Sequence, residues 1–404
     1  MGLRGDAAIV GFHELPATRK PTGAAEFTIE QWARLAAAAV ADAGLSVQQV
    51  DGLVTCGVME SQLFVPSTVA EYLGLGVNFA EIVDLGGASG AAMVWRAAAA
   101  IELGLCQAVL CAIPANYLTP MSAERPYDPG DALFYGASSF RYGSPQAEFE
   151  IPYGYLGQNG PYAQVAQMYA AAYGYDETAM AKIVVDQRVN ANHTPGAVFR
   201  DKSVTIADVL DSPIIASPLH MLEIVMPCMG GSAVLVTNAE LARTTRHRPV
   251  WIRGFGERVP YKSPVYAADP LQTPMVKVAE SAFGMAGLSP ADMDMVSIYD
   301  CYTITALLTL EDAGFCAKGA GMQFVTDHDL TFRGDFPMNT AGGQLATLQH
   351  QGGQARADGQ HGGADHQAQQ ARGRHAQHDQ RGFGRGGHQQ PGFGCCAAPR
   401  AHQP

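Results

Sequence analysis

The sequence has little charge and no excess of positive charge. Lys and Arg total 26 against 38 Asp and Glu, which gives a formal net charge of -12 over 404 residues. Binding to a phosphate backbone needs Lys and Arg in excess, so the composition argues against nucleic acid as a partner. With 47% hydrophobic residues the chain can bury a large core, and it is typical of a compact α/β protein of two fused units.

Cysteine pairs of the kind that bind zinc or form disulfide frameworks are also missing. The eight cysteines contain no Cys-x-x-Cys pair, so we expect no metal in this chain and a reducing, cytoplasmic compartment. No signal peptide opens the sequence, and Arg96 and Glu102 interrupt its Ala-rich runs, so no membrane span is expected.

The C-terminal segment lacks the residues that build a core. After Leu348 there is no Leu, Ile, Val, Met, Trp, Tyr, Lys, Glu, Ser, Thr or Asn. This composition predicts a disordered low-complexity tail over residues 349–404. Metal binding by its histidines is a second hypothesis, although their spacing is irregular. We favour a third, that the tail is an out-of-frame translation of a GC-rich gene, because the change of composition falls inside a motif.

Strand and helix patterns alternate through the first part of the chain. Short apolar runs at 7–11, 50–57, 80–83 and 108–113 predict strands, and helical spacing predicts helices at 28–43, 68–72 and 91–103. Residues 114–218 are rich in Tyr, Gly and Pro and predict an inserted loop domain. We therefore expect a first half over 1–225 and an incomplete second half over 226–348.

One local pattern occurs twice. A helix, the run Ala-Gly-Leu-Ser, an acidic residue and a strand follow one another from Ala43 to Val54 and again from Ala286 to Ile298. An internal repeat of about half the chain predicts two structurally similar halves.

A glycine-rich turn connects a predicted strand to a predicted helix at Asp84–Gly90. Such a turn can direct backbone N–H groups and the positive end of the helix toward a thiolate, an oxyanion or a phosphate. The alternative is a plain glycine turn that lets the helix pack closely. Ser89 is the one nucleophile on it, and no histidine lies nearby in the sequence to activate that hydroxyl.

Three segments resemble motifs of the thiolase superfamily. Gly87-Ala88-Ser89-Gly90 is similar to the family's Cys-x-Ser-Gly, with Gly87 in place of the cysteine that attacks acyl-CoA. Tyr299-Asp300-Cys301-Tyr302 resembles the His-Asp-Cys-Phe segment of sterol-carrier-protein-type thiolases, with Tyr299 in place of histidine. The run from Asn339 to Gly343 resembles Asn-x-x-Gly-Gly, but the family's Gly-His-Pro loop does not follow it. The matches keep the family's order over residues 5–345.

The resemblance implies an α/β thiolase fold, in which two pseudo-duplicated halves form a layered αβαβα core and the inserted loop domain covers the active site. It also implies that the substrate is an acyl-CoA, so that coenzyme A arrives as part of the substrate and no cofactor is bound. The substrate-binding positions carried over from the motifs are Gly86, Gly87, Ser89, Gly90, Asn339, Gly342 and Gly343.

Thiolase chemistry needs a thiolate to take the acyl group, and Gly87 cannot supply one. A retro-aldol cleavage needs no acyl-enzyme, because a base removes the β-hydroxyl proton and the Cα–Cβ bond breaks. The resemblance implies Tyr299 as that base, Asp300 as its orienting partner and Tyr302 beside them. A phenol has an ordinary pKa near 10, so Tyr299 needs a shifted pKa or a proton relay. The alternative is that Tyr299 only fills the space of the family's histidine.

Glycine for the nucleophile and tyrosine for the histidine resemble the thiolase-like retro-aldolases of steroid side-chain degradation. Those enzymes act on 17-hydroxy steroid acyl-CoA esters with a zinc-ribbon and OB-fold partner that holds the zinc. The resemblance therefore implies a homodimer bound to such a partner. Two other functions stay open: acyl transfer of the acetyl-CoA acetyltransferase type, and non-catalytic carriage of acyl-CoA or lipid.

Overall fold

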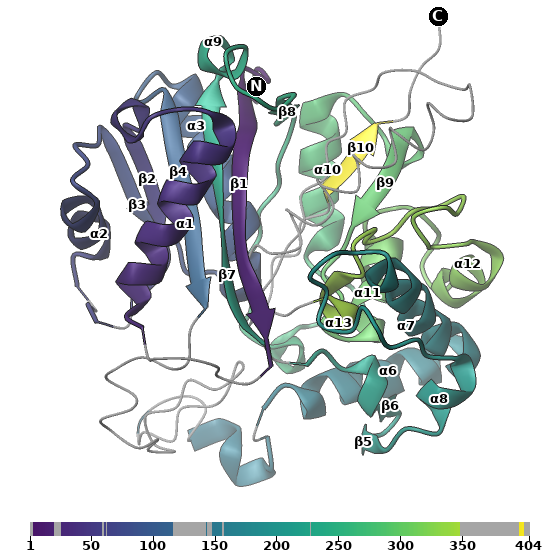
Figure 1. Cartoon of the computed structure of the whole chain (residues 1–404). Coiled ribbons are helices and arrows are strands. Elements are labelled where there is room, and N and C mark those ends of the chain that lie inside the picture. The colour runs from purple at the N-terminus through teal and green to yellow at the C-terminus, as the bar shows by residue number, and fades with distance from the viewer. Residues whose placement is uncertain are drawn as a thin grey trace, which may run out of the picture.

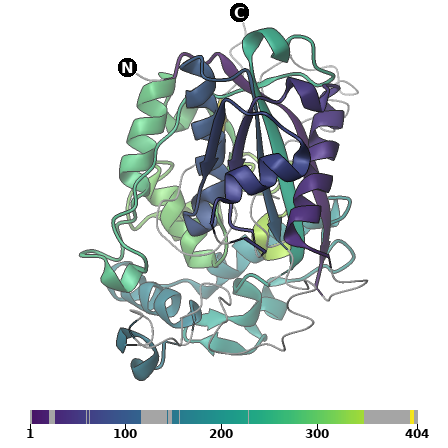
Figure 2. The same ribbon diagram turned by 90° about the vertical axis from the view of Figure 1, so that its left-hand side faces the viewer.

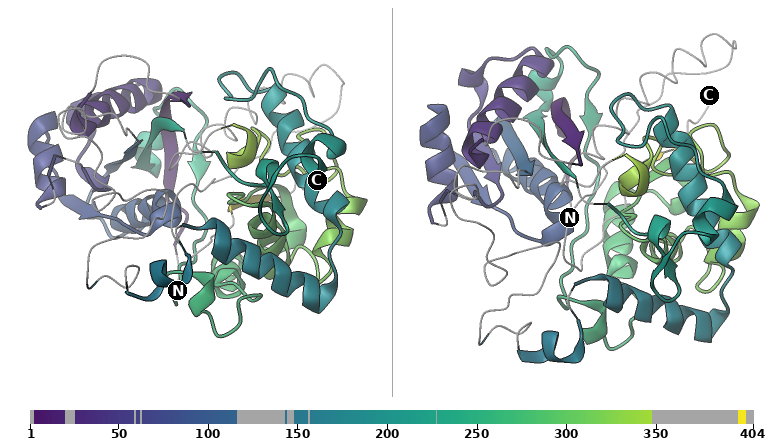
Figure 3. Two further views of the ribbon diagram at one scale, coloured as in Figure 1. Left: turned by 90° about the horizontal axis from the view of Figure 1, so that it is seen from below. Right: turned by 60° about the horizontal axis from the view of Figure 1, so that its bottom comes forward.

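The computed structural model describes residues 3–19, 26–58, 60–61, 63–115, 143, 148–155, 157–226, 228–347 and 396–399. Two units lie side by side, a sheet flanked by helices and a mainly helical unit around a short strand (Figure 1). The left panel of Figure 3 shows the same two units from below, with the helices of the predicted insertion, 159–173 and 177–192, packed on the second unit. No helix among the described residues is long and apolar enough to cross a membrane.

The first unit is a mixed sheet with the strand order β3-β2-β4-β7-β1-β8. β2 pairs in parallel with β3 and β4, whereas β7 is antiparallel to both β4 and β1. The strands are β1 (Ala7–Thr18), β2 (Gly52–Thr55), β3 (Phe79–Ile82), β4 (Ala108–Ala115), β7 (Met229–Asn238) and β8 (Val250–Trp251).

The predicted boundary at 225/226 is corrected by the position of β7. We expected this strand to open the second half, but it lies inside the first sheet, between β4 and β1 (Figure 1). Its buried residues complete both faces of that sheet, since Leu235 joins one core cluster and Val236 the other. Because β8 also pairs with β1 in this sheet, the first unit extends at least to Trp251.

Helices cover the two faces of the first sheet, as Figure 2 shows from the side of that unit. α1 (Thr28–Ala43) and α2 (Val65–Leu73) share one apolar core with the sheet, centred on Trp32 and Leu35. α3 (Ser89–Glu102) covers the opposite face through residues such as Met93. The helix 28–43 predicted from apolar spacing has the predicted bounds.

The internal repeat is confirmed in local geometry. α1 ends at Gly44 with φ 76°, and α10 (Met275–Ala286) ends at Gly287 with φ 67°. Each is followed by a one-turn 3-10 helix closed by a capping box, in which Ser46 pairs with Gln49 and Ser289 with Asp292. These turns lead into β2 and into β9 (Met293–Ser297).

The second unit is built around β9. On one side, the Val296 N–H donates to Pro337 O (2.9 Å) and the Asn339 N–H donates to Val296 O (2.9 Å). On the other side, β9 pairs with β10 (Cys396–Pro399) in antiparallel. The other helices and strands of this unit are α6 (Asn159–Tyr173), α7 (Glu177–Asn192), α8 (Ile206–Leu210), β5 (Ile214–Ala216), β6 (Leu219–His220), α11 (Thr303–Asp312), α12 (Gly321–Asp327) and α13 (Gly343–Ala346). The short helix α9 (Ala239–Ala242) lies beside β1 and β7 of the first unit.

The C-terminal segment differs from the prediction at four positions. Residues 396–399 form β10, so the prediction of a tail without regular structure is wrong there. The reason is that an open strand edge offers hydrogen-bond partners to backbone of almost any sequence. The rest of the tail, 349–395 and 400–404, lies outside the described residues, as does 116–142 of the predicted insertion.

Candidate active site

Tyr299, Asp300 and Tyr302 lie where the chain leaves β9 and begins α11. All three side chains are buried, with exposed fractions of 6%, 0% and 5%. An antiparallel bridge between Ile224 and Tyr302, together with the Val225 N–H bond to Cys301 O (2.9 Å), holds the segment from one side. The sequence therefore places a short polar segment in the middle of an apolar core.

The Tyr299 phenol is neutral near neutral pH. Burial is the largest cause that raises its pKa well above the ordinary value, and the nearby Cys301 and Tyr162 add to the effect. Removing a proton would leave a negative charge in a poorly solvated place, which is unfavourable. In this state the phenol can donate a hydrogen bond, but the fraction present as phenolate is small.

Tyr302 is held by α6, a helix inside the predicted insertion 114–218. Its hydroxyl donates to Asn159 Oδ1 (2.7 Å), and its ring stacks on that of Tyr162 with centroids 4.2 Å apart. The aromatic pair and the hydrogen bond fix both the plane and the direction of the phenol. Asn159 and Tyr162 were not predicted as site residues, because α6 is distant from Tyr302 in the sequence and carries no motif.

The Asp300 carboxylate faces the start of α13. It accepts hydrogen bonds from the backbone N–H groups of Gln344 (2.7 Å) and Leu345 (3.4 Å). Burial raises its pKa to about 7, and the hydrogen bonds from these two amides oppose that rise. A Cβ at Gly343, where φ is 59°, would lie 2.1 Å from Asp300 Oδ2, so this carboxylate requires glycine there.

The Asn339 side chain bonds the backbone that precedes Tyr299. Its Oδ1 accepts from the Ile298 N–H (2.6 Å) and its Nδ2 donates to Ile298 O (2.9 Å). Asn339 is fully buried and has a left-handed φ of 48°, a conformation that asparagine tolerates better than most residues. Gly342 and Gly343 continue the same turn. The structure thus brings together the motif at Tyr299 and the motif at Asn339.

The glycine turn of the first half forms its own network. The Ser89 hydroxyl donates to Gly86 O (2.7 Å) and accepts from the Leu85 N–H (2.9 Å). Gly86 has φ 54° and opens the one-turn helix Gly86–Ala88, in which Gly87 is buried, and Gly90 then lies in the first turn of α3. The hydrogen bonds described for this turn stay within residues 84–89, so Ser89 orders the turn.

A buried acid that sequence analysis missed lies behind the site. Glu223 accepts from the Thr303 hydroxyl (2.8 Å) and from the His220 N–H (2.8 Å), and burial raises its pKa. Apart from His220 and Glu223, the run from Leu219 to Val225 is apolar. An acid isolated in an apolar run is a signal from which a buried carboxyl group could have been predicted. Glu223 fixes Thr303, the first residue of α11 and the neighbour of Tyr302.

Three of the described thiols are poorly suited to acyl transfer. Burial raises the pKa of Cys56, Cys106 and Cys301 to about 12, so they are neutral thiols near neutral pH. Within the described part of the chain, no three or more His, Cys, Asp or Glu side chains are grouped so that they could hold a metal ion.

Residues 256–357 match the family described as thiolase C-terminal domain-like. The chain is 31% identical over 355 residues to a steroid side-chain-cleaving aldolase of Thermomonospora curvata, covering 85% of this chain and 86% of that protein. The chain belongs to the thiolase superfamily. Within the superfamily it is also 31% identical over 363 residues to a 17-hydroxy-3-oxo-4-pregnene-20-carboxyl-CoA lyase of Mycobacterium tuberculosis, with 85% and 87% covered.

The fold agrees with a solved Ltp2-ChsH2(DUF35) aldolase, which is 27% identical in sequence. The TM-score is 0.77, with 98% of this chain and 99% of that chain covered. The thiolase fold and the sterol-carrier-type branch predicted from the motifs are therefore confirmed. The roles of the individual site residues stay predictions.

Proposed function

We propose that this protein cleaves a carbon–carbon bond of a β-hydroxyacyl-CoA by a retro-aldol reaction, with a steroid side chain as the acyl group. The observation that carries the proposal is the combination of Gly87 at the nucleophile position with a buried phenol, Tyr299, at the end of β9. Two relatives of 31% identity named as an aldolase and as an acyl-CoA lyase support it.

In the proposed reaction, the small fraction of Tyr299 that is present as phenolate takes the proton of the β-hydroxyl group and becomes the neutral phenol. The Cα–Cβ bond breaks, the β-carbon becomes a ketone carbonyl, and the electron pair moves into the thioester to form an enolate. The proton then returns to Cα and gives the shorter acyl-CoA. Protons and electrons balance without an added reagent, and no acyl-enzyme forms.

The other predicted residues receive distinct parts in this proposal. The turn of Gly86, Gly87, Ser89 and Gly90 supplies backbone N–H groups toward the acyl-CoA thioester, where enolate charge develops. Asp300 and Tyr302 keep the segment around Tyr299 in place, which their hydrogen bonds to α13 and α6 support. Asn339, Gly342 and Gly343 form the turn to which that segment is tied.

The proposed assembly is a homodimer with a zinc-ribbon and OB-fold partner subunit, in which the partner holds the zinc. The solved aldolase of similar fold carries two components in its name, which supports a second subunit. β3 ends the described order of the first sheet, and Ile82 on it is 46% exposed, so this edge is suited to pairing with a second copy.

The direct test uses two substrates and product analysis by mass spectrometry. The purified chain, with and without a co-encoded zinc-ribbon protein, is incubated with a β-hydroxyacyl-CoA, or with a β-ketoacyl-CoA plus free CoA. We expect cleavage of the hydroxy ester in the absence of free CoA. Cleavage of the keto ester that depends on CoA would establish acyl transfer instead, and turnover of neither ester would favour a carrier.

Tyr299→Phe tests the base. Removing the phenol oxygen should lower kcat by about 100-fold or more, because proton transfer by a positioned group contributes on that scale. Because the pKa of Tyr299 is raised well above 10, kcat of the unsubstituted protein should also rise steadily from pH 6 to pH 9. An undiminished kcat in the Tyr299→Phe variant, or a rate that falls with pH, would remove Tyr299 from this role.

A further inference from the structure

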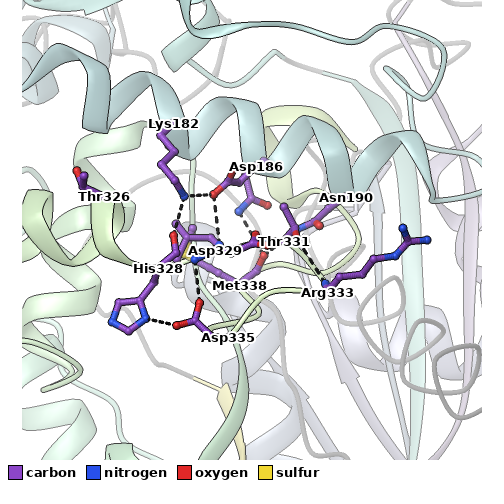
Figure 4. A network of polar contacts seen from close by, with 12 residues as sticks. Lys182, Asp186, Asn190, Thr326, His328, Asp329, Thr331, Arg333, Asp335 and Met338 are labelled. Atoms are coloured by element: carbon purple, nitrogen blue, oxygen red, sulfur yellow. Dashed lines mark hydrogen bonds and ion pairs between the residues drawn. The ribbon is translucent and has the colours of Figure 1, made fainter. Parts of the chain in front are cut away.

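A polar network joins α7 to the loop that precedes Asn339 (Figure 4). Lys182 donates to His328 O (2.7 Å), the Leu330 N–H donates to Asp186 Oδ2 (3.3 Å), and further along the helix Asn190 reaches the same loop. The three α7 side chains lie one helical turn apart and all point toward this loop in Figure 4.

Asn190 makes the contacts nearest to the site. Its Nδ2 donates to Met338 O (3.0 Å) and Asn339 O (3.2 Å), and its Oδ1 accepts from the Phe332 N–H (2.8 Å). The side chain is fully buried, with an exposed fraction of 0%. All three bonds go to backbone groups of one loop, so Asn190 holds this loop on both sides of residues 333–337.

The next link is the left-handed backbone of Asn339. A non-glycine residue at φ 48° is held in place only where surrounding contacts determine it, and two such contacts come from Asn190. From that position the Asn339 side chain reaches both backbone groups of Ile298. Ile298 directly precedes Tyr299, so the direction in which the phenol projects depends on this pair of bonds.

We infer that Asn190 is a positioning residue for Tyr299, acting through Asn339 and the backbone of Ile298. The inference rests on the proposed function for its kinetic consequence, but the mechanical link can be measured without turnover. Asn190 touches neither Tyr299 nor the glycine turn in the described contacts, so it affects the reaction through geometry alone.

The test compares Asn190→Ala, Asn339→Gly and the double variant. Glycine at position 339 keeps the left-handed backbone and deletes only the amide that bonds Ile298. We expect Asn190→Ala to lower kcat by about 10- to 100-fold with KM changed by less than about 2-fold, because misplacement of a reacting group affects the chemical step. The double variant should have no lower kcat than Asn339→Gly alone.

Hydrogen–deuterium exchange supplies the second readout. The Ile298 amide is bonded to Asn339 Oδ1, and it should exchange at least about 10-fold faster in both single variants, relative to amides of β7. Thr273→Val is the matched control: it deletes a hydrogen bond to Asp312 (2.7 Å) in the same unit and should leave kcat and Ile298 exchange unchanged.

Should Asn190→Ala fail to fold, Asn190→Asp keeps an acceptor for the Phe332 N–H and replaces the donor to Met338 and Asn339 with a carboxylate oxygen. Unchanged Ile298 exchange in the folded variant, or kcat losses that multiply in the double variant, would overturn the inference. If the unsubstituted protein cleaves no hydroxy ester, the proposed function fails, and the exchange measurement still decides whether Asn190 controls the Tyr299 segment.

Discussion

Burial of the Asp300 carboxyl group makes the stability of the folded chain depend on pH. Its folded pKa is about 7, whereas an unperturbed carboxyl has a value near 3.8. Between those values the folded chain keeps a proton that the unfolded chain has released. The stability that Asp300 contributes is therefore fully present below pH 3.8, and it is lost as the pH rises from there through about 7.

Asp300→Asn removes that titration while keeping an oxygen that can accept from the Gln344 N–H. We expect the free energy of unfolding to fall less between pH 4 and pH 7 in the variant than in the unsubstituted protein, by on the order of 4 kcal/mol at most. Urea denaturation at several pH values measures the difference. Parallel pH profiles for the two proteins would show that Asp300 does not titrate in this range.

The Ser89 side chain is directed at its own turn. Its hydroxyl makes two hydrogen bonds inside its own turn and is 1% exposed. Ser89→Ala should lower the unfolding free energy by about 1 to 2 kcal/mol, with kcat per folded molecule within about 2-fold. A loss of kcat as large as that expected for Tyr299→Phe would instead identify Ser89 as a participant in the reaction.

At the scale of elements, glycines in matching positions of the two repeats allow close backbone contact with the helices α1 and α10. A Cβ at Gly11 would lie 2.4 Å from Ala39 O in α1, and one at Gly254 would lie 2.3 Å from Ala282 O in α10; Ala39 and Ala282 each lie four residues before the end of their helix. Two residues further on, a Cβ at Gly256 would lie 2.1 Å from Val278 O in the same helix. Backbone oxygens cannot rotate away as side chains can. The repeat therefore extends from the helix caps to the packing of the helices themselves.

Gly11→Ala and Gly256→Ala should each destabilise the protein by about 2 kcal/mol or more, because the helix must shift outward. Gly76→Ala is the control, since nothing lies within 4 Å of its Cβ position and its backbone is not left-handed. Thermal denaturation of the three variants measures the effect. Equal melting temperatures for Gly76→Ala and Gly256→Ala would contradict this account of α10 packing.

At the scale of the whole molecule, the two repeats have different neighbours. β2 lies between two parallel strands, β3 and β4, whereas β9 has the parallel segment 337–339 on one side and the antiparallel β10 on the other. The composition after Leu348 supplies few residues that could form a buried parallel strand. This supports the proposal that the tail is read out of frame.

The neighbouring reading frame of the gene after codon 348 should encode a helix, two apolar strands and a Cys-x-Gly turn. A protein carrying that sequence should melt about 10 °C higher, because longer apolar strands would take the place of the four-residue β10 beside β9. Sequencing and thermal denaturation check the two parts. A neighbouring frame of equally low complexity, or an early stop codon within it, would exclude the frame hypothesis.

The sequence by itself determined the local features and the family. Apolar spacing predicted α1, the Ala-Gly-Leu-Ser repeat predicted matching caps at Gly44 and Gly287, and motif order predicted the thiolase fold. These features depend on residues close together in the chain, or on motifs that can be compared directly. Such information is present in the sequence without knowledge of distant contacts.

Only the tertiary structure decided which distant groups meet. The position of β7 in the first sheet, the direction of the Asp300 carboxylate and the link from Asn190 through Asn339 to Ile298 all join residues far apart in sequence. Burial then set the protonation of Tyr299 and Asp300, since a pKa depends on solvent exclusion and neighbours. Contacts between distant residues and the burial of a side chain depend on several segments at once, so the local sequence pattern could not predict them.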